Sequence, residues 1–151
     1  MREDDGSRRR REAFAVLAAA PAEMLARLWR ESGLPDEGAL LRGPETGLVA
    51  LRGRIGGGGS PFNFGEATVT RASVKLPSGE IGHAYALGRD REKARISANI
   101  DALRQKPDFA AAVEEKILGP LRRELQERDE QRRAEIAATR VEFFTMVRGE
   151  D

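Results

Sequence analysis

The spacing of apolar residues changes its period along the chain, which predicts helices at both ends and strands in the middle. Residues 8–32 repeat at i, i+3 and i+4, and this spacing predicts two short helices that break at Pro21. Proline favours the first helical position, and Gly33 is a C-terminal stop signal. We expect residues 34–38 to form a loop. The repeating apolar positions are Phe14, Leu17, Leu25, Leu28 and Trp29.

Between residues 39 and 88 apolar and polar residues alternate, as in strands with one solvated face. A first strand alternates the apolar residues Val49, Leu51 and Ile55 with Arg52 and Arg54. A second alternation runs through Ala67 and Val69 and then changes parity to Ala72, Val74 and Leu76. A slip of one residue near Thr70 and Arg71 would produce this change and predicts a β-bulge there.

The sequence LPSGE follows, with Pro77 and Gly79 placed for a type I turn and a glycine bulge. The returning strand contains Ile81, His83, Tyr85 and Leu87. Together these segments predict an antiparallel β-meander of three to four strands.

Helical spacing returns at residues 90–105, where Asp90 is the candidate N-cap. Pro107 ends this helix, and Asp108 is placed to cap the next one, which reaches about Leu118. Gly119-Pro120 is expected to break or kink the chain. A final helix over residues 121–147 would be about 40 Å long.

The final helix is polar over most of its length. Leu125 is its one substantial apolar residue between Arg122 and Glu135. The pairs Glu124–Arg128 and Asp129–Arg133 have the i,i+4 spacing of solvated or domain-bridging helices. Two interpretations stay open: the helix projects and its apolar end contacts a partner, or the helix folds back onto the sheet.

The apolar end has the sequence EIAATRVEFFTMV. Phe143 and Phe144 lie about 100° apart on a helix, so one is expected to face this chain's core and the other a partner. Met146 would adapt the fit, and Val147 belongs to the same predicted interface. The alternative places both phenylalanines in one intramolecular stripe.

The order of these elements predicts an α+β fold in which N-terminal helices and a long C-terminal helical region flank the meander. A chain of 151 residues has the length of about one domain. We expect residues 1–9 to form a flexible charged terminus and residues 10–151 a single domain. A projecting C-terminal helix is expected over about residues 121–148.

Charge and composition narrow the function classes. The 26 basic and 25 acidic residues leave a net charge of +1, so no overall field attracts nucleic acid or a membrane surface. No cysteine is present, which excludes disulfides, thiol nucleophiles and zinc–thiolate sites and fits a reducing cytoplasm. No apolar run approaches the roughly 20 residues that a membrane span needs.

The N-terminus imitates a secretory signal, because RRRRE precedes AFAVLAAAPA. Glu12 within the basic run, the short apolar stretch and the new amphipathic turn at Pro21 argue against secretion. We therefore expect a cytoplasmic protein.

The run of four glycines at residues 56–59 lies between two predicted strands. A phosphate-binding P-loop would need a following lysine and a helix, and neither follows. Pro61 and Phe62 also exclude the register G-x-G-x-x-G. A hairpin loop is favoured over a flexible linker, and Arg54 and Arg71 near its base could present donors to an anion.

Candidate chemistry of the chain itself is sparse. His83 is the single histidine, so it is expected to be a packed or hydrogen-bonded histidine of the sheet. Ser60, Thr70 and Ser73 have no base near them in the sequence. The sequence therefore predicts no catalytic residue and no metal site.

Three segments resemble one known family: PETGLVALRGRIGGGGSPFNFGEATVTRASVKL, GHAYALGRD and VEFFTMVRGED. They are similar to PhnG, the G subunit of the carbon–phosphorus lyase core complex of bacterial phosphonate catabolism. The likeness runs from about Arg10 to the C-terminus, and the number of glycines is a local departure. Its strongest parts are Glu45–Val49, Phe64–Arg71, Gly88–Asp90 and Phe143–Gly149.

The resemblance implies a role in an ATP-dependent reaction in which a phosphonate displaces adenine from the nucleotide ribose. ATP and an alkylphosphonate would be substrates of the complex, with no cofactor in this chain. In that family the nucleosidase chemistry belongs chiefly to the I subunit. The implied partners are subunits I, H and J, with the K and L proteins associating. A supporting scaffold or coupling role is expected; the alternative is a transferase that acts alone.

The resemblance also brings out individual residues. Arg71, Arg89 and Arg148 lie inside the similar segments and, with Arg54, are the candidates for binding a phosphate or phosphonate. The alternative is that such an arginine pairs with a carboxylate. The residues expected to be structural are Glu45, Gly47, Gly65 and Asp90.

Overall fold

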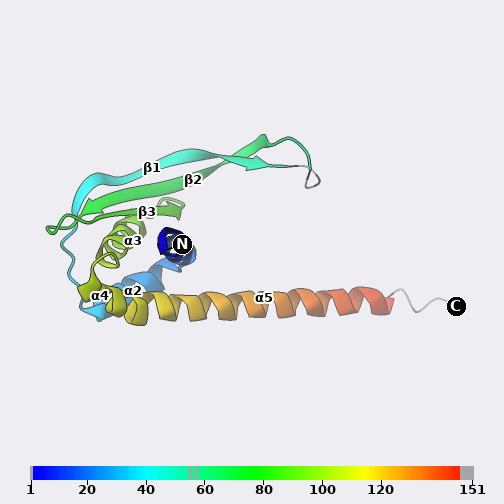
Figure 1. Ribbon diagram of the computed structural model, residues 1–151. Helices are drawn as coiled ribbons and strands as arrows, with labels where there is room; N and C mark the ends of the chain where they lie inside the picture. Colours follow the sequence, from blue (N-terminus) through cyan, green and yellow to red (C-terminus); the bar gives the residue numbers. More distant parts are fainter. Residues whose placement is uncertain (1, 55, 57, 147–151) are drawn as a thin grey trace.

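The computed structural model describes residues 2–54, 56 and 58–146, and the side chains of residues 5–54, 56 and 58–138. It has an α+β fold built on a three-stranded antiparallel sheet in the order β1-β2-β3, as predicted (Figure 1). In chain order the elements are α1 (Arg2–Ala19), α2 (Ala22–Ser32), β1 (Ala39–Gly53), β2 (Phe62–Lys75), β3 (Ile81–Leu87), α3 (Arg91–Leu103), α4 (Pro107–Val113), the π-helical turn η2 (Glu114–Leu118) and α5 (Gly119–Met146).

One face of the sheet packs closely on α3, because both sides of that contact carry small residues. On β3 the buried residues are Gly82, Ala84 and Ala86. A Cβ atom at Gly82 would lie 2.0 Å from the carbonyl oxygen of Ala98 in α3. The core continues from this contact into α1, α2 and the helices that follow α3 (Figure 1). Its largest fully buried apolar residues are Leu25, Val74, Ile100, Leu103, Val113, Ile117, Leu118 and Leu121.

The predicted β-bulge at Thr70–Arg71 is wrong. Strands β2 and β3 pair without a shift from Val69↔Leu87 to Lys75↔Ile81. Thr70 is fully buried on the α3 face, where its hydroxyl donates to the carbonyl of Gly88 at 2.8 Å. The parity therefore does not change: a buried threonine continues the apolar positions of the inner face. The register shifts lie in the pairing of β1 with β2, and one of them, between Arg42 and Glu45, faces Ser73 and Arg71.

Helix α1 begins at Arg2, although the sequence predicted a helix from residue 8 and a flexible terminus over residues 1–9. Asp5 pairs with Arg8 at 3.1 Å and with Arg9 at 2.9 Å. Such i,i+3 and i,i+4 ion pairs favour the helix, so the charged run continues it. Three small or apolar residues of the following segment are buried in the core: Ala13, Leu17 and Ala20.

The helix signals are confirmed in part. Gly33 ends α2 in a left-handed conformation with φ 67°, and Asp90 caps α3 by accepting from the backbone N–H of Lys93 at 2.8 Å. Asp108 does not cap α4, because the helix begins at Pro107 and Lys106 is its N-cap residue. Asp108 therefore lies within the first turn. The expected break at Gly119-Pro120 takes the form of η2, since Pro120 has no N–H to continue an α-helical pattern.

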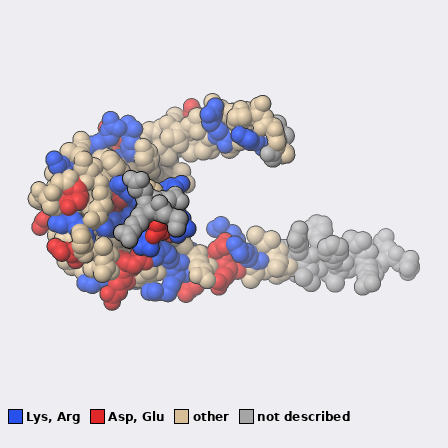
Figure 2. Space-filling view, viewed as in Figure 1, with Lys and Arg blue, Asp and Glu red and all other residues tan. Residues whose placement is uncertain are grey.

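Two projections leave the body of the molecule in the same direction, with open space between them (Figure 1, Figure 2). One is the outer part of the β1–β2 hairpin, described over residues 46–54, 56 and 58–69, which we call the hairpin arm. Its two strands pair as far as Gly53 and Phe62, so the segment with the glycines lies in a hairpin connection, as predicted. The other is α5, whose side chains at 131–138 are exposed. Over the described residues α5 does not fold back onto the sheet. None of the described helices is long and apolar enough to cross a membrane.

Candidate functional site

The face of the sheet opposite α3, which we call the outer face, carries the large side chains of β3. Because small residues fill the contact with α3, the alternation of the strand turns Ile81, His83, Tyr85 and Leu87 outward. Leu87 is 73% exposed and Tyr85 59% exposed. The inner face of β3 therefore carries small, buried residues, and its outer face carries large, exposed ones.

Arg71 lies at the centre of the outer face, between its cross-strand partners Glu45 and Tyr85. Its guanidinium Nη2 is 3.1 Å from Glu45 Oε2, and Nε donates to the same oxygen at 3.2 Å. Hydrogen bonds to Glu45 and then to Tyr85 raise the pKa of Arg71. This candidate anion-binding residue is therefore paired with a carboxylate, which is the alternative that the sequence left open.

A shallow groove of about 260 Å³ brings three of the sequence-predicted residues together, Glu45, Gly47 and Arg71. Val49, Val69 and Tyr85 complete its lining with parts of Thr46 and Leu48. Gly47 leaves open space here, since a Cβ atom at that position would meet no atom within 4 Å.

The other sequence-predicted residues lie apart. Arg54 follows β1 at the far end of the hairpin arm, whereas Arg89 follows β3 near the body. Both are exposed, and neither has an ion-pair partner in the described part of the chain. Asp90 caps α3, and Gly65 pairs with Leu51 in the hairpin arm.

The predicted interface at the end of α5 falls largely outside what the structure describes. Val147 and Arg148 lie outside the described residues. Phe143, Phe144 and Met146 belong to α5, but their side chains are outside the described part. These residues stay predictions.

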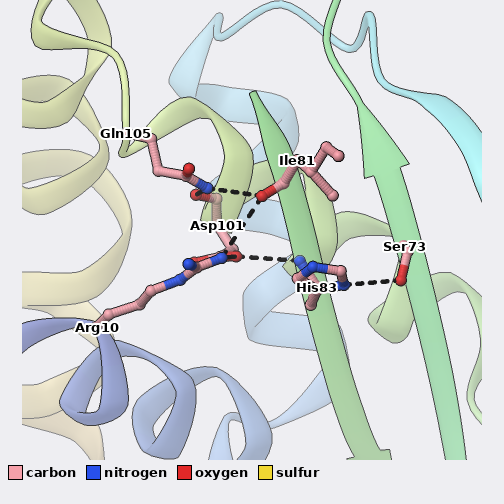
Figure 3. A network of polar contacts seen from close by, with 6 residues as sticks. All are labelled: Arg10, Ser73, Ile81, His83, Asp101 and Gln105. Carbon is pink, nitrogen blue, oxygen red and sulfur yellow. Dashed lines mark hydrogen bonds and ion pairs between the residues drawn. The ribbon is translucent and has the colours of Figure 1, made fainter. Parts of the chain in front are cut away.

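A buried carboxylate that the sequence did not single out joins α1, α3 and β3 (Figure 3). Asp101 accepts from Arg10 Nη2 at 2.7 Å, from Arg10 Nε at 3.1 Å and from the backbone N–H of His83 at 3.0 Å. The bond to Asp101 raises the pKa of Arg10. The available sequence signal is the position of Asp101 on the same helical stripe as Ala94 and Ala98.

His83 is a hydrogen-bonded histidine of the sheet, as predicted. Its ring Nδ1 lies 2.8 Å from the hydroxyl of Ser73, so the expectation that Ser73 has no base nearby is wrong (Figure 3). The two residues are cross-strand partners, and this contact could not be predicted because they lie ten residues apart in the sequence. No described carboxylate contacts the ring, so the pair lacks the third group that orients a catalytic base. The described residues also contain no cluster that could hold a metal ion.

A second, larger groove of about 600 Å³ lies between α1 and the edge strand β3. Phe14, Ala15 and Ala18 form its helical wall, and His83 and Tyr85 form the opposite wall. Arg10 also lines it, with its guanidinium held by Asp101. The walls are mainly apolar, and Tyr85 separates this groove from the smaller one on the outer face.

The hairpin arm exposes large apolar side chains on both of its strands. Few charged residues lie along the arm apart from basic ones toward its end (Figure 2). Its exposed large residues are Leu48 (65%), Val49 (38%), Leu51 (36%), Phe62 (42%) and Phe64 (59%). The rings of Phe62 and Phe64 lie 6.1 Å apart, and Phe64 covers Gly53. Because Leu48 and Val49 are consecutive in a strand, apolar side chains are exposed on both faces of the arm. Exposed apolar surface of this kind marks a protein interface. With the outer face it forms the candidate functional site, a docking surface.

Comparison with known proteins gives a consistent result. A family model described as "Phosphonate metabolism protein PhnG" matches residues 8–149. The protein named "Alpha-D-ribose 1-methylphosphonate 5-triphosphate synthase subunit PhnG" from Rhizobium meliloti (strain 1021) is 49% identical over 149 residues, which are 99% of this chain and 95% of that protein. The resemblance found in the three sequence segments is thereby confirmed, and the chain belongs to the PhnG family of phosphonate metabolism proteins.

Proposed function

We propose that this chain is a subunit of the synthase that forms alpha-D-ribose 1-methylphosphonate 5-triphosphate from ATP and methylphosphonate, with release of adenine. The name of the Rhizobium relative supports the product, and the substrates and the release of adenine follow from the family resemblance. The observation that carries the subunit role is the uncovered apolar surface of the hairpin arm and the outer face. The proposed partners are the I, H and J subunits, with the K and L proteins associating, in the cytoplasm.

The energetics favour a covered hairpin arm. Complete burial of one large apolar side chain contributes about 1.5–3 kcal/mol. Five such side chains are partly exposed on the hairpin arm, in addition to Tyr85 and Leu87 on β3. A partner that covers them contributes toward offsetting the entropy lost on association, which is of the order of 4–15 kcal/mol.

The role proposed for the chain within the complex is scaffolding and coupling, without a catalytic residue of its own. On the outer face, Arg71 is bonded to both Glu45 and Tyr85. Arg89 and Arg54 are exposed without an ion-pair partner among the described residues and are the arginines that we propose for contact with a phosphate or phosphonate. Replacing Arg89 by Gln should lower the transfer rate of the assembled complex without dissolving it.

The docking role is tested by co-expression of the chain with the other subunits and mass measurement of the intact particle. The variant Phe64→Ser should lose most of its copurification, because this side chain is 59% exposed on the hairpin arm. The variant Leu41→Ser is a matched control, since Leu41 is 56% exposed at the opposite end of β1. Undiminished copurification of Phe64→Ser would contradict the proposed interface.

The absence of independent catalysis needs a separate assay. The purified chain, incubated with ATP and methylphosphonate, should release no adenine, whereas the reconstituted complex should do so. Adenine release by the isolated chain would show a transferase that acts alone.

A further inference from the structure

Strand β3 forms one edge of the sheet, and half of this edge is covered by side chains. The backbone N–H of His83 donates to Asp101 at 3.0 Å. The carbonyl of Ile81 accepts from Gln105 at 2.8 Å and from Arg10 at 3.5 Å (Figure 3). These bonds cap the outward-facing backbone groups at the beginning of β3.

The second half of the same edge is open. Outward-facing groups recur at every second residue of an edge strand, so those of Tyr85 and Leu87 follow those of His83. The carbonyl of His83, both backbone groups of Tyr85 and the N–H of Leu87 therefore point away from β2. No described residue forms a hydrogen bond with them. Backbone groups in this pattern are a template for another strand.

The groove of about 600 Å³ runs beside this open edge. Its far wall is the apolar side of α1, with Phe14, Ala15 and Ala18. Extended peptides bind in such positions by strand addition: the edge supplies main-chain hydrogen bonds, and pockets receive alternate side chains. The groove between α1 and β3 offers both features in one place.

We propose that this groove receives an extended segment of a partner subunit, which adds to the sheet as a fourth strand beside β3. The segment pairs with Tyr85 and Leu87 and turns apolar side chains toward Phe14, Ala15 and Ala18. It is uncharged where it lies in the groove, because the guanidinium of Arg10 is already bonded to Asp101. This inference rests on the proposed function, since it assumes assembly with partner subunits.

A second copy of this chain is a poorer occupant of the groove. Paired strands lie about 4.8 Å apart. The β3 edge of a second copy would bring its own α1 and its own Arg10–Asp101 contact along the same side. The occupant is therefore a strand without a flanking helix, which points to another chain.

The first test compares Leu87→Pro with Leu87→Ala in the co-expressed complex. Both variants remove a side chain that is 73% exposed, but only proline removes the outward N–H. No hydrogen bond within the chain is lost, because that N–H faces away from β2. The Leu87→Pro complex should dissociate about tenfold more readily than the Leu87→Ala complex, which corresponds to one lost hydrogen bond. Equal affinities would overturn the proposal.

Amide hydrogen exchange provides a measurement without mutation. The amides of Tyr85 and Leu87 should exchange rapidly in the isolated chain and slowly in the assembled complex. A complex that forms while these amides stay unprotected overturns the fourth strand but leaves the subunit role intact. Failure to form any complex contradicts the proposed function itself. Protection that grows with the concentration of the isolated chain would show self-pairing and would also overturn the proposal.

Discussion

The part of the sheet that lies on α3 and the hairpin arm differ in which residues are buried. Where β3 lies on α3, Gly82 is buried, and a Cβ atom there would lie 2.0 Å from backbone oxygen. In the hairpin arm, Gly47 and Gly65 lie in open space, while Leu48 and Phe64 are more than half exposed. Glycine occurs in both parts, so its residue type alone does not explain this difference. The presence of α3 under one part of the sheet, and of no described element under the other, explains it.

The largest effect is expected at the glycine beneath α3. Replacing Gly82 by Ala should lower the free energy of unfolding by about 3 kcal/mol, because the methyl group meets the backbone of α3, which cannot yield easily. Urea unfolding followed by circular dichroism measures the change. The matched variants Gly47→Ala and Gly65→Ala should stay within about 0.5 kcal/mol of the natural sequence. Similar losses in all three variants would remove the contrast between the two parts.

The second largest loss of stability is expected at Arg10, which is bonded to the buried carboxylate of Asp101. Arg10→Ala should destabilise the chain by about 2–3 kcal/mol, because the carboxylate of Asp101 would retain the His83 N–H as its only partner among the described residues. The matched variant is Arg54→Ala at the end of the hairpin arm, which should leave the unfolding midpoint unchanged. Thermal denaturation of both variants decides the point; equal midpoints would mean that Asp101 finds another partner.

Helix ends provide a smaller contrast. Asp90→Ala removes the N-cap of α3 and should cost about 1 kcal/mol. Asp129→Ala in α5 breaks its exposed ion pair with Arg133 and should cost only a few tenths of a kcal/mol. Both changes are measured by denaturant unfolding. A larger loss for Asp129→Ala would mean that α5 is packed more tightly than its exposed side chains indicate.

The smallest effect is a dependence on pH. Hydrogen bonds from Arg95 lower the pKa of Glu92, so the folded state holds this carboxylate charged more readily than the unfolded state. The resulting stability is complete above the unfolded pKa of about 4.3 and is lost as the pH falls through the lower folded pKa. Glu92→Gln should therefore reduce the acid-induced loss of stability, by well under 1 kcal/mol for an exposed pair.

The control for this titration is the partner of Glu92. In an Arg95→Gln background the change Glu92→Gln should no longer alter how the unfolding free energy falls as the pH drops below the unfolded pKa of about 4.3. A persistent difference in that background would assign the effect to another group.

Local signals in the sequence predicted much of the fold. The turn at Pro77–Gly79 is present, with the Gly79 N–H donating to the carbonyl of Leu76 at 2.9 Å. The alternation of β3 and the long polar helix are also present. These features depend on residues a few positions apart, so a short stretch of sequence includes all the residues that interact.

The candidate site was harder to predict, because its contacts join distant parts of the chain. Asp101 bonds to Arg10 and to His83, which lie 91 and 18 residues away. Ser73 meets His83 only because the register of β2 and β3 places them opposite each other. A pattern in a short stretch of sequence cannot identify partners that lie so far apart in the chain.

The sequence by itself determined which residues share a face of the sheet, because side chains alternate along any strand. Only the tertiary structure decided which of the two faces is buried. The small residues of β3 allow α3 to approach closely, so Gly82, Ala84 and Ala86 turn inward. The large residues Ile81, Tyr85 and Leu87 are then left outside, since one strand cannot present both sets of side chains to the same helix.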